Sequence, residues 1–344
     1  MTVLDVFRAQ ATACAALGSP FNARLMTLCA EHLTTDSPVG AHILNWKGDP
    51  SIQADSVPLR LAGALHRLVL RGDPDLSPHW PPHETDDAAL WAIVETALTE
   101  KADQIIPLLA SAPQTNEVRR SAVIIPALHL IAAWAGKPLS IMELGASAGL
   151  NLLKDQFAVD TGTVRYGPQN PLFTLTPEWT GNHPAPASVD IAARRGVDLT
   201  PISAEKSEDC ERLMSYIWPD QEDRKTRTQA ALEAARRSGL TPDAGDAGDW
   251  LTDALPRTDP DQMAVIYHTV AWQYFPDATK TTAMKAMNTF GADRPLARIS
   301  MENDGQGKGA LVTLTLWPEA REIVLGRADF HGRWVDWTGP TRLD

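Results

Sequence analysis

The sequence predicts an α/β protein in which a helical N-terminal domain, residues 1–136, precedes a doubly wound, mostly parallel sheet, residues 137–344. Apolar residues recur at three- and four-residue spacing through the first part, as in "VLDVFRAQATACAAL". After residue 137, strand-like and helix-like segments alternate. A glycine-rich stretch, Gly145–Gly149, lies between the first of these strands and the helix expected after it.

The helical domain contains several amphipathic segments separated by turn-rich stretches. Its other helices are expected over "NARLMTLCAEHL", "VPLRLAGALHRLVLRG" and "DAALWAIVETALTEKADQIIPLLA". Asp86 or Asp87 is expected to cap the helix that begins at Ala88. The most apolar run, "SAVIIPALHLIAAWAG", is shorter than the roughly 20 residues of a membrane span, so we interpret it as a core helix.

The second domain begins with the strand "LSIMEL" and a helix over "LNLLKDQF". Residues 158–187 hold short strand-like pieces, and "VDIAARRGVDLTPI" is a strand that ends at Asp198. Helices interrupted at Trp218-Pro219 follow, and then "PDAGDAGDWL", an acidic turn. A buried strand, "MAVIYH", and a helix, "ATKTTAMKAMNTFG", come next. The chain ends with four strands expected at one edge of the sheet: "LARISME", "ALVTLTLW", "REIVLGRAD" and "RWVDW".

Charge and cysteine content narrow the class of protein. The net charge of −12 argues against a nucleic-acid or membrane-surface binder, because both need a basic field. Three cysteines without a C-x-x-C motif indicate a reducing, cytoplasmic setting, and the N-terminus lacks the long apolar region of a signal peptide. We expect no metal site, because neither a Cys/His cluster nor H-E-x-x-H occurs. A small-molecule substrate is the expected partner.

The stretch "ELGASAGLNL" allows three interpretations. A turn of small residues before a helix N-terminus can cradle a nucleotide, with Glu143 accepting hydrogen bonds from the ligand. Gly145-Ala-Ser147-Ala-Gly149 also matches G-x-S-x-G, the nucleophile elbow of serine hydrolases, in which Ser147 would attack the substrate. In the third interpretation the protein is a non-catalytic ligand-binding protein or carries a tight turn with no ligand.

The surroundings of this stretch favour the nucleotide cradle. A hydrolase elbow follows several strands and an HGGG-type oxyanion loop, whereas the upstream residues here have helical patterns. A triad of Ser147, Asp246 and His331 can be assembled by chain order alone. A dinucleotide fingerprint would need a glycine at position 147, so NAD and FAD rank lower.

Glu143, Gly145 and Gly149 resemble motif I of class I S-adenosylmethionine-dependent methyltransferases, E/D-x-G-x-x-x-G. The resemblance implies a Rossmann-like sheet of the methyltransferase type and S-adenosylmethionine as cofactor. It adds Ser147 and Asn151, from the same stretch, to the cofactor-binding set.

Two later acids continue the methyltransferase resemblance. Asp198, at a strand end, would bind the ribose, although it follows Glu143 by 55 residues instead of about 20, which requires an insertion over 158–187. Asp246, in the acid–small pair Asp246-Ala247, would lie near the adenine.

The substrate side is expected at later strand ends, where open α/β sheets collect catalytic groups. His268, Tyr274 and Glu302 are the catalytic candidates, and His268 could take a proton from the methyl acceptor. Trp272 would line the substrate site. The polar stretch "QTNEVRRS" adds Asn116, Glu117 and Arg120, with Asn116 and Arg120 on one helical face, to close over the cofactor or bind an anionic substrate group.

Several phrases together resemble a bacterial family known as domain of unknown function 2332. They span about residues 5–338 and include "LRLAGALHRLVLRG", "QTNEVRRSA", "ELGASAGLNL", "RRGVDLTPI", "IWPDQEDR" and "FHGRWVDW". The resemblance implies a methyltransferase-like Rossmann domain with a helical N-terminal part, and it brings no established catalytic residues.

Overall fold

The computed structural model describes residues 2–344 and divides into two compact units. The first unit extends to Thr115 and includes Lys206–Thr226; the second comprises Asn116–Glu205 and Arg227–Asp344. The sequence placed the boundary at residue 136. Helix α7 (Ser121–Ala135) instead belongs with the sheet, because its apolar side chains pack on the sheet strands.

The first unit is helical, as predicted. Its helices bury one continuous apolar core that includes Phe7, Leu25, Leu65 and Trp80. Asp86 accepts the Ala89 N–H and thereby caps α5, in agreement with the prediction. The helices are α1 (Val3–Ala16), α2 (Pro20–His32), α3 (Pro38–Leu44), α4 (Val57–Leu70), η1 (Ser77–His79), α5 (Asp87–Glu100), α6 (Ala102–Leu109) and α8 (Ser207–Ser215); α9 (Glu222–Ser238) continues into the second unit.

The second unit is built on a nine-stranded sheet in the order β5-β12-β11-β10-β9-β8-β1-β6-β7. Every predicted strand from "LSIMEL" onward is present. The strands are β1 (Leu139–Leu144), β5 (Glu178–Gly181), β6 (Ile191–Asp198), β7 (Asp243–Ala244), β8 (Met263–Thr269), β9 (Leu296–Glu302), β10 (Ala310–Leu316), β11 (Arg321–Ala328) and β12 (Trp334–Trp337).

Strands β7, β6, β1, β8 and β9 are parallel, whereas β10, β11 and β12 continue as an antiparallel meander. From β1 the chain passes outward to β6 and β7, and it then returns to place β8 on the other side of β1. This reversal places the topological switch point at the carboxyl ends of the neighbouring strands β1 and β8. Ligands of open α/β sheets bind outside the strand ends at such a point. The predicted α/β class, with N-terminal helices and a mostly parallel central sheet, is confirmed.

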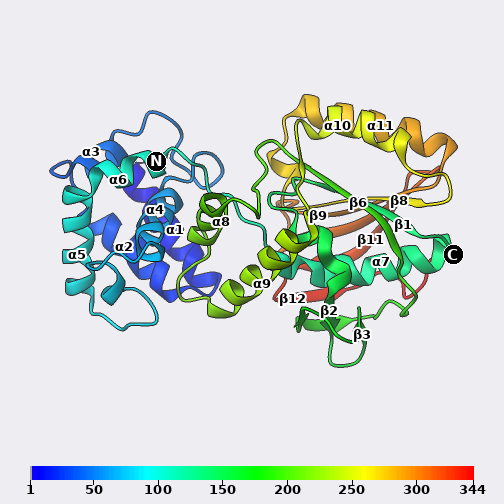
Figure 1. The fold of residues 1–344 in the computed structure, drawn as a ribbon, viewed down its shortest axis with the longest axis horizontal. Coiled ribbons are helices and arrows are strands. Elements are labelled where there is room, and N and C mark those ends of the chain that lie inside the picture. The colour runs from blue at the N-terminus through cyan, green and yellow to red at the C-terminus, as the bar shows by residue number, and fades with distance from the viewer. Residues whose placement is uncertain (1) are drawn as a thin grey trace. The chain divides into compact units, whose positions relative to one another are not determined.

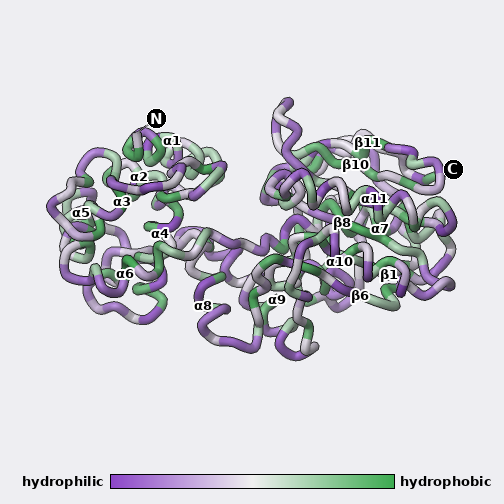
Figure 2. Tube along the Cα trace, turned by 90° about the horizontal axis from the view of Figure 1, so that it is seen from above, coloured by the Kyte–Doolittle hydropathy of each residue, from purple (hydrophilic) through white to green (hydrophobic). Residues whose placement is uncertain are grey.

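Helices cover both faces of this sheet (Figure 1). Helix α7 packs on one face, and α10 (Ala247–Ala254) and α11 (Asp277–Asp293) pack on the other. Residues 118–135 are apolar and long enough to cross a membrane, but 72% of this segment is buried inside the unit, and Figure 2 shows its hydrophobic character beside the central strands. It is the core helix that the sequence predicted.

Two local predictions differ from the structure, those for residues 150–156 and for the acidic turn before Trp250. Leu150–Gln156 is a 3-10 helix, η3, that leads directly into β2 (Phe157–Asp160). The short strands predicted in the insertion are present as β3 (Arg165–Tyr166) and β4 (Phe173–Leu175), which form a small separate sheet with β2. The predicted acidic turn contains α10, because the Asp246 carboxylate accepts the N–H groups of Gly248 and Asp249 and starts a helix there.

Candidate functional site

The candidate site lies at the carboxyl ends of the parallel strands. Glu143 is near the end of β1, Asp198 ends β6, and His268 is near the end of β8. Strand pairing brings these ends together, since Glu143 is in register with Gly196 of β6 and with Tyr267 of β8. The insertion over 158–187 therefore leaves Asp198 on the strand next to β1, as the sequence required.

The glycine loop, Gly145–Gly149, turns sharply between β1 and η3. Gly145, Ser147 and Gly149 all have positive φ, at 70°, 53° and 70°. A Cβ on Gly145 would lie 2.6 Å from Ala271 Cβ, so glycine is needed there both for its φ and for the close approach of the segment after β8. The close approach at Gly145 is thus made by the protein's own chain.

Most of the polar groups of the glycine loop are bound within the unit. The Ser147 N–H donates to Asp198 Oδ2 at 2.9 Å, and the Leu150 N–H donates to Asn116 Oδ1 at 2.8 Å. The Ser147 carbonyl accepts the Ile202 N–H at 3.1 Å. The half-buried Asp198 is consequently an anchor of the loop as well as a strand-end acid.

The segment "QTNEVRRS" lies directly against this loop. The Asn151 side chain accepts from Ser121 Oγ at 2.8 Å and donates to the Glu117 carbonyl at 3.3 Å. Arg120 donates to the carbonyls of Thr269 and Phe330 at 2.9 Å each. These contacts attach the segment to the glycine loop, and its predicted closure over a cofactor or an anionic substrate group stays a prediction.

The predicted helical face of Asn116 and Arg120 is wrong. Residues Val118–Arg120 form a short 3-10 helix, and Asn116 precedes it in extended chain. The reason is that the Asn116 side chain is drawn to the loop, where it accepts the Leu150 N–H. Asn116 and Glu117 are both buried.

Sequence reasoning missed a buried polar cluster beneath the glycine loop. The Tyr267 hydroxyl donates to Glu143 Oε2 at 3.1 Å and lies 3.2 Å from the Asn151 carbonyl oxygen. Lys154 Nζ lies 3.4 Å from the centre of the Tyr267 ring, and it has no hydrogen-bond partner within residues 2–344. A polar residue inside each of two apolar stretches, "LNLLKDQF" and "MAVIYH", was the available signal.

Burial shifts the pKa of both charged members of this cluster. It raises the pKa of Glu143 to about 7, against the attraction of Lys154 and the hydrogen bond from Tyr267. Burial also lowers the pKa of Lys154 to about 7, against the attraction of Glu143. Glu143 is only 2% exposed, so it supports the loop from below and presents no carboxylate to a ligand at the edge.

His268 is fully buried, and both of its ring nitrogens are occupied. Nδ1 lies 2.7 Å from Glu302 Oε1, and Arg298 Nε donates to Nε2 at 3.0 Å. Because Nε2 accepts, the ring proton must be on Nδ1, which donates to Glu302. Burial lowers the pKa of His268, so the ring is neutral and has no lone pair left for a substrate proton. The role of His268 as a general base does not fit this arrangement.

Glu302 organises the turn after β8. It accepts the N–H groups of Ala271 and Trp272, each at 3.1 Å, in addition to the His268 proton. Although burial alone would raise the pKa of Glu302, these hydrogen bonds and the His268 ring lower it. Glu302 therefore holds the turn as an ionised acceptor and is not a proton donor.

The other predicted residues are dispersed around this turn. Tyr274 is 62% exposed and lies in the short helix η5 (Trp272–Tyr274). Trp272 stacks on His268, with ring centres 5.0 Å apart. Asp246 caps α10 and also accepts a hydrogen bond from Thr279 Oγ1 of α11. Its carboxylate therefore connects α10 to α11.

Ser147 lacks the partner that a serine nucleophile needs. Its positive φ is compatible with a strained elbow. However, its Oγ is buried and has no hydrogen-bond partner among residues 2–344, so no histidine is positioned to deprotonate it. The same residues contain no group of three or more His, Cys, Asp or Glu side chains arranged to hold a metal ion.

Comparison with known proteins gives one match. Residues 5–337 match the family model described as an uncharacterized protein conserved in bacteria, DUF2332. No curated protein and no solved structure matches the chain.

Proposed function

The chain belongs to the bacterial DUF2332 family, and we propose that it is an S-adenosylmethionine-dependent methyltransferase that acts on a small molecule. One observation carries this proposal. Numbered along the chain, the parallel strands β7-β6-β1-β8-β9 have the order 3-2-1-4-5 of doubly wound nucleotide-binding sheets, with the glycine loop after the first strand.

The residues at the switch point fit an adenosyl cofactor in part. Asp198 ends the strand next to β1, the position of a ribose-binding acid in such sheets. Ser147 supports the fit differently, because its buried Oγ has no hydrogen-bond partner in the described part of the chain and a ligand hydroxyl or amine would supply one. We assign the cofactor contacts to Asp198 and Ser147.

Three residues predicted to touch the cofactor take other roles in this proposal. Glu143 accepts a hydrogen bond from Tyr267, and the two buried side chains support the loop from below. Asp246 fixes the start of α10. Asn151 likewise connects the loop to the segment before α7 instead of facing a ligand.

The bound cofactor would supply an electrophilic methyl group, and the protein's contribution would be mainly orientation. The turn Ala271–Tyr274 is rigidly held by Glu302 next to Gly145, so it can position an acceptor beside the cofactor. His268 would stabilise that turn as a neutral ring. The acceptor must then lose its proton to water or to a group outside this network. The three free cysteines suit the proposed cytoplasmic location.

The test is calorimetric titration of the full-length protein with S-adenosylmethionine and S-adenosylhomocysteine. Asp198 accepts the Ser147 N–H on Oδ2 and the Thr200 N–H on Oδ1, and Asp198→Asn keeps an oxygen for only one of them while removing the charge. We therefore expect at least about tenfold weaker binding and a loss of stability of about 1 kcal/mol. Asp253→Asn, on the exposed surface of α10, is the matched control and should bind as the wild type does.

Other ligands separate the competing functions. Absence of binding by both adenosyl compounds at millimolar concentration would contradict the proposal. Binding of NAD or AMP in their place would favour a non-catalytic nucleotide-binding protein. Labelling of Ser147 by a covalent serine probe would revive the hydrolase alternative.

A further inference from the structure

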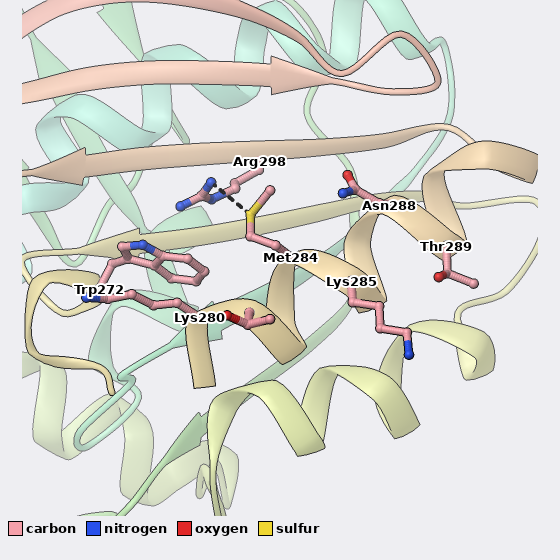
Figure 3. Close-up of a pocket in the computed structure, with 8 residues that line it drawn as sticks. Trp272, Lys280, Met284, Lys285, Asn288, Thr289 and Arg298 are labelled. Atoms are coloured by element: carbon pink, nitrogen blue, oxygen red, sulfur yellow. Dashed lines mark hydrogen bonds between the residues drawn. The ribbon is translucent and has the colours of Figure 1, made fainter. Parts of the chain in front are cut away.

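A groove lies on the face of the sheet that carries α11. It is a shallow groove of about 680 Å³ between α11, Trp272 and Arg298 (Figure 3). From α11 it is lined by Lys280, Thr281, Met284, Lys285, Asn288 and Thr289. The lining contains three cations and no acid, although the whole chain carries a net charge of −12.

Arg298 is the most unusual residue of the groove. Its Nε donates to His268, and Nη1 makes only a 3.5 Å contact with Met284 Sδ. Glu302 and Glu322 attract this half-buried guanidinium from a distance, but within residues 2–344 neither forms an ion pair or hydrogen bond with it, and Nη2 has no hydrogen-bond partner. Because neither acid contacts the guanidinium, its outer edge is suited to bind an external anion at the groove.

The groove offers a second cation and an apolar surface. Lys280 Nζ lies 3.7 Å from Asp277 Oδ1, but that carboxylate is fully exposed and the pair is therefore weak. The Trp272 ring lies beside Arg298, with the guanidinium 4.3 Å from the ring centre. Figure 3 shows Arg298 and Met284 facing each other, with Lys280 next to Trp272.

We infer that this groove binds a small organic oxyanion, a phosphate monoester or a carboxylate, with the anionic group on Arg298 and Lys280 and the apolar part on Trp272 and Met284. The planar guanidinium matches either anion in a two-point contact. This inference stands on the groove alone and goes beyond the proposed cofactor site. The Trp272 turn joins the two, because its neighbour Ala271 contacts Gly145.

The probes are phenyl phosphate, benzoate and inorganic phosphate, titrated into the full-length protein by calorimetry. We expect phenyl phosphate or benzoate to bind, and the tighter of the two identifies the anion class. Inorganic phosphate should bind at least several-fold more weakly, because it lacks the apolar part. Equal binding of phenyl phosphate and inorganic phosphate would contradict a role for Trp272.

Variants locate the binding. Arg298→Gln should weaken the tighter probe more than about tenfold and Lys280→Gln about three- to tenfold. Lys225→Gln is the matched control, since Lys225 forms the same i,i+3 pair with Glu222 at 3.6 Å on a different helix. If Arg298→Gln unfolds, Lys280→Gln decides the result. No binding at 10 mM, or equal losses in Lys280→Gln and Lys225→Gln, would overturn the inference.

Discussion

The glycine loop and the α11 groove belong to the same unit but differ in how their polar groups are satisfied. Around the loop, Asp198 and Asn116 accept backbone N–H groups, and most of the stretch is buried. Along the groove, Arg298 Nη2 has no hydrogen-bond partner within residues 2–344. The stretch with the more distinctive sequence is thus the more closed one, whereas residues with no motif form the more open surface.

The largest effect is expected where the two regions meet, at Glu302. Glu302→Ala leaves the N–H groups of Ala271 and Trp272 and the His268 proton without their acceptor. Breaking such a buried network costs about 3–5 kcal/mol. Chemical denaturation should show this loss, while Glu319→Ala, at an exposed position, should leave the unfolding free energy nearly unchanged. A loss below about 1 kcal/mol would mean that the turn does not depend on Glu302.

A second variant tests whether the loop is closed by the protein's own chain. Gly145→Ala combines an unfavourable φ of 70° with a Cβ only 2.6 Å from Ala271 Cβ, and should cost roughly 2–4 kcal/mol. Gly162→Ala is the control, since its φ of 80° is similar but no atom lies within 4 Å of the added Cβ. It should cost only about 1–2 kcal/mol. Equal losses in the two variants would show that the approach of Ala271 is unimportant.

The cluster beneath the loop should give stability a specific pH dependence. Lys154 has its pKa lowered from 10.5 to about 7, so the unfolded state binds more protons between these values and the free energy of unfolding rises with pH there. Glu143 has its pKa raised from 4.5 to about 7, so the folded state binds more protons and the free energy falls from pH 4.5 to 7.

Two substitutions separate these contributions. Lys154→Met should remove the rise in the free energy of unfolding above pH 7, and Glu143→Gln should remove its fall below pH 7. Each slope is at most about 1.4 kcal/mol per pH unit. Urea unfolding at pH 5, 7 and 9 measures both slopes. Profiles parallel to that of the wild type would show that neither group is buried as a perturbed acid or base.

The smallest effect concerns the hydroxyl that connects this cluster to β8. Tyr267→Phe removes the donor to Glu143 and should cost about 1 kcal/mol. It should also raise the pKa of Glu143 further, which the pH profile would show as a shift of the acidic limb. Tyr274→Phe serves as its control, because Tyr274 is 62% exposed and its change should lie within about 0.5 kcal/mol.

Much of the fold could be predicted because the strands are short apolar runs between turn signals. The strands "LSIMEL" and "MAVIYH" are buried on both faces, and their sequences are accordingly continuous apolar runs. Helix α10 was missed because glycines and acids dominate its first turn, and only the capping by Asp246 reveals it. The domain assignment of α7 depended on long-range packing, which periodicity does not encode.

The site was predicted less completely than the fold. Strand-end positions correctly placed Glu143, Asp198 and His268 at one edge, because parallel strands share that edge. Their roles depended on partners distant in sequence. Arg298 and Glu302 bind the two ring nitrogens of His268, and Tyr267 donates to Glu143. No local sequence pattern predicts these contacts.

The most direct test of the central proposal is photolabelling of the full-length protein with radiolabelled S-adenosylmethionine, followed by peptide mapping. We expect the label in the peptides that contain the glycine loop or residues 198–204, and we expect Asp198→Asn to reduce it. Excess S-adenosylhomocysteine should compete for the site. Absence of specific label, or label confined to the α11 groove around Trp272 and Arg298, would contradict the account.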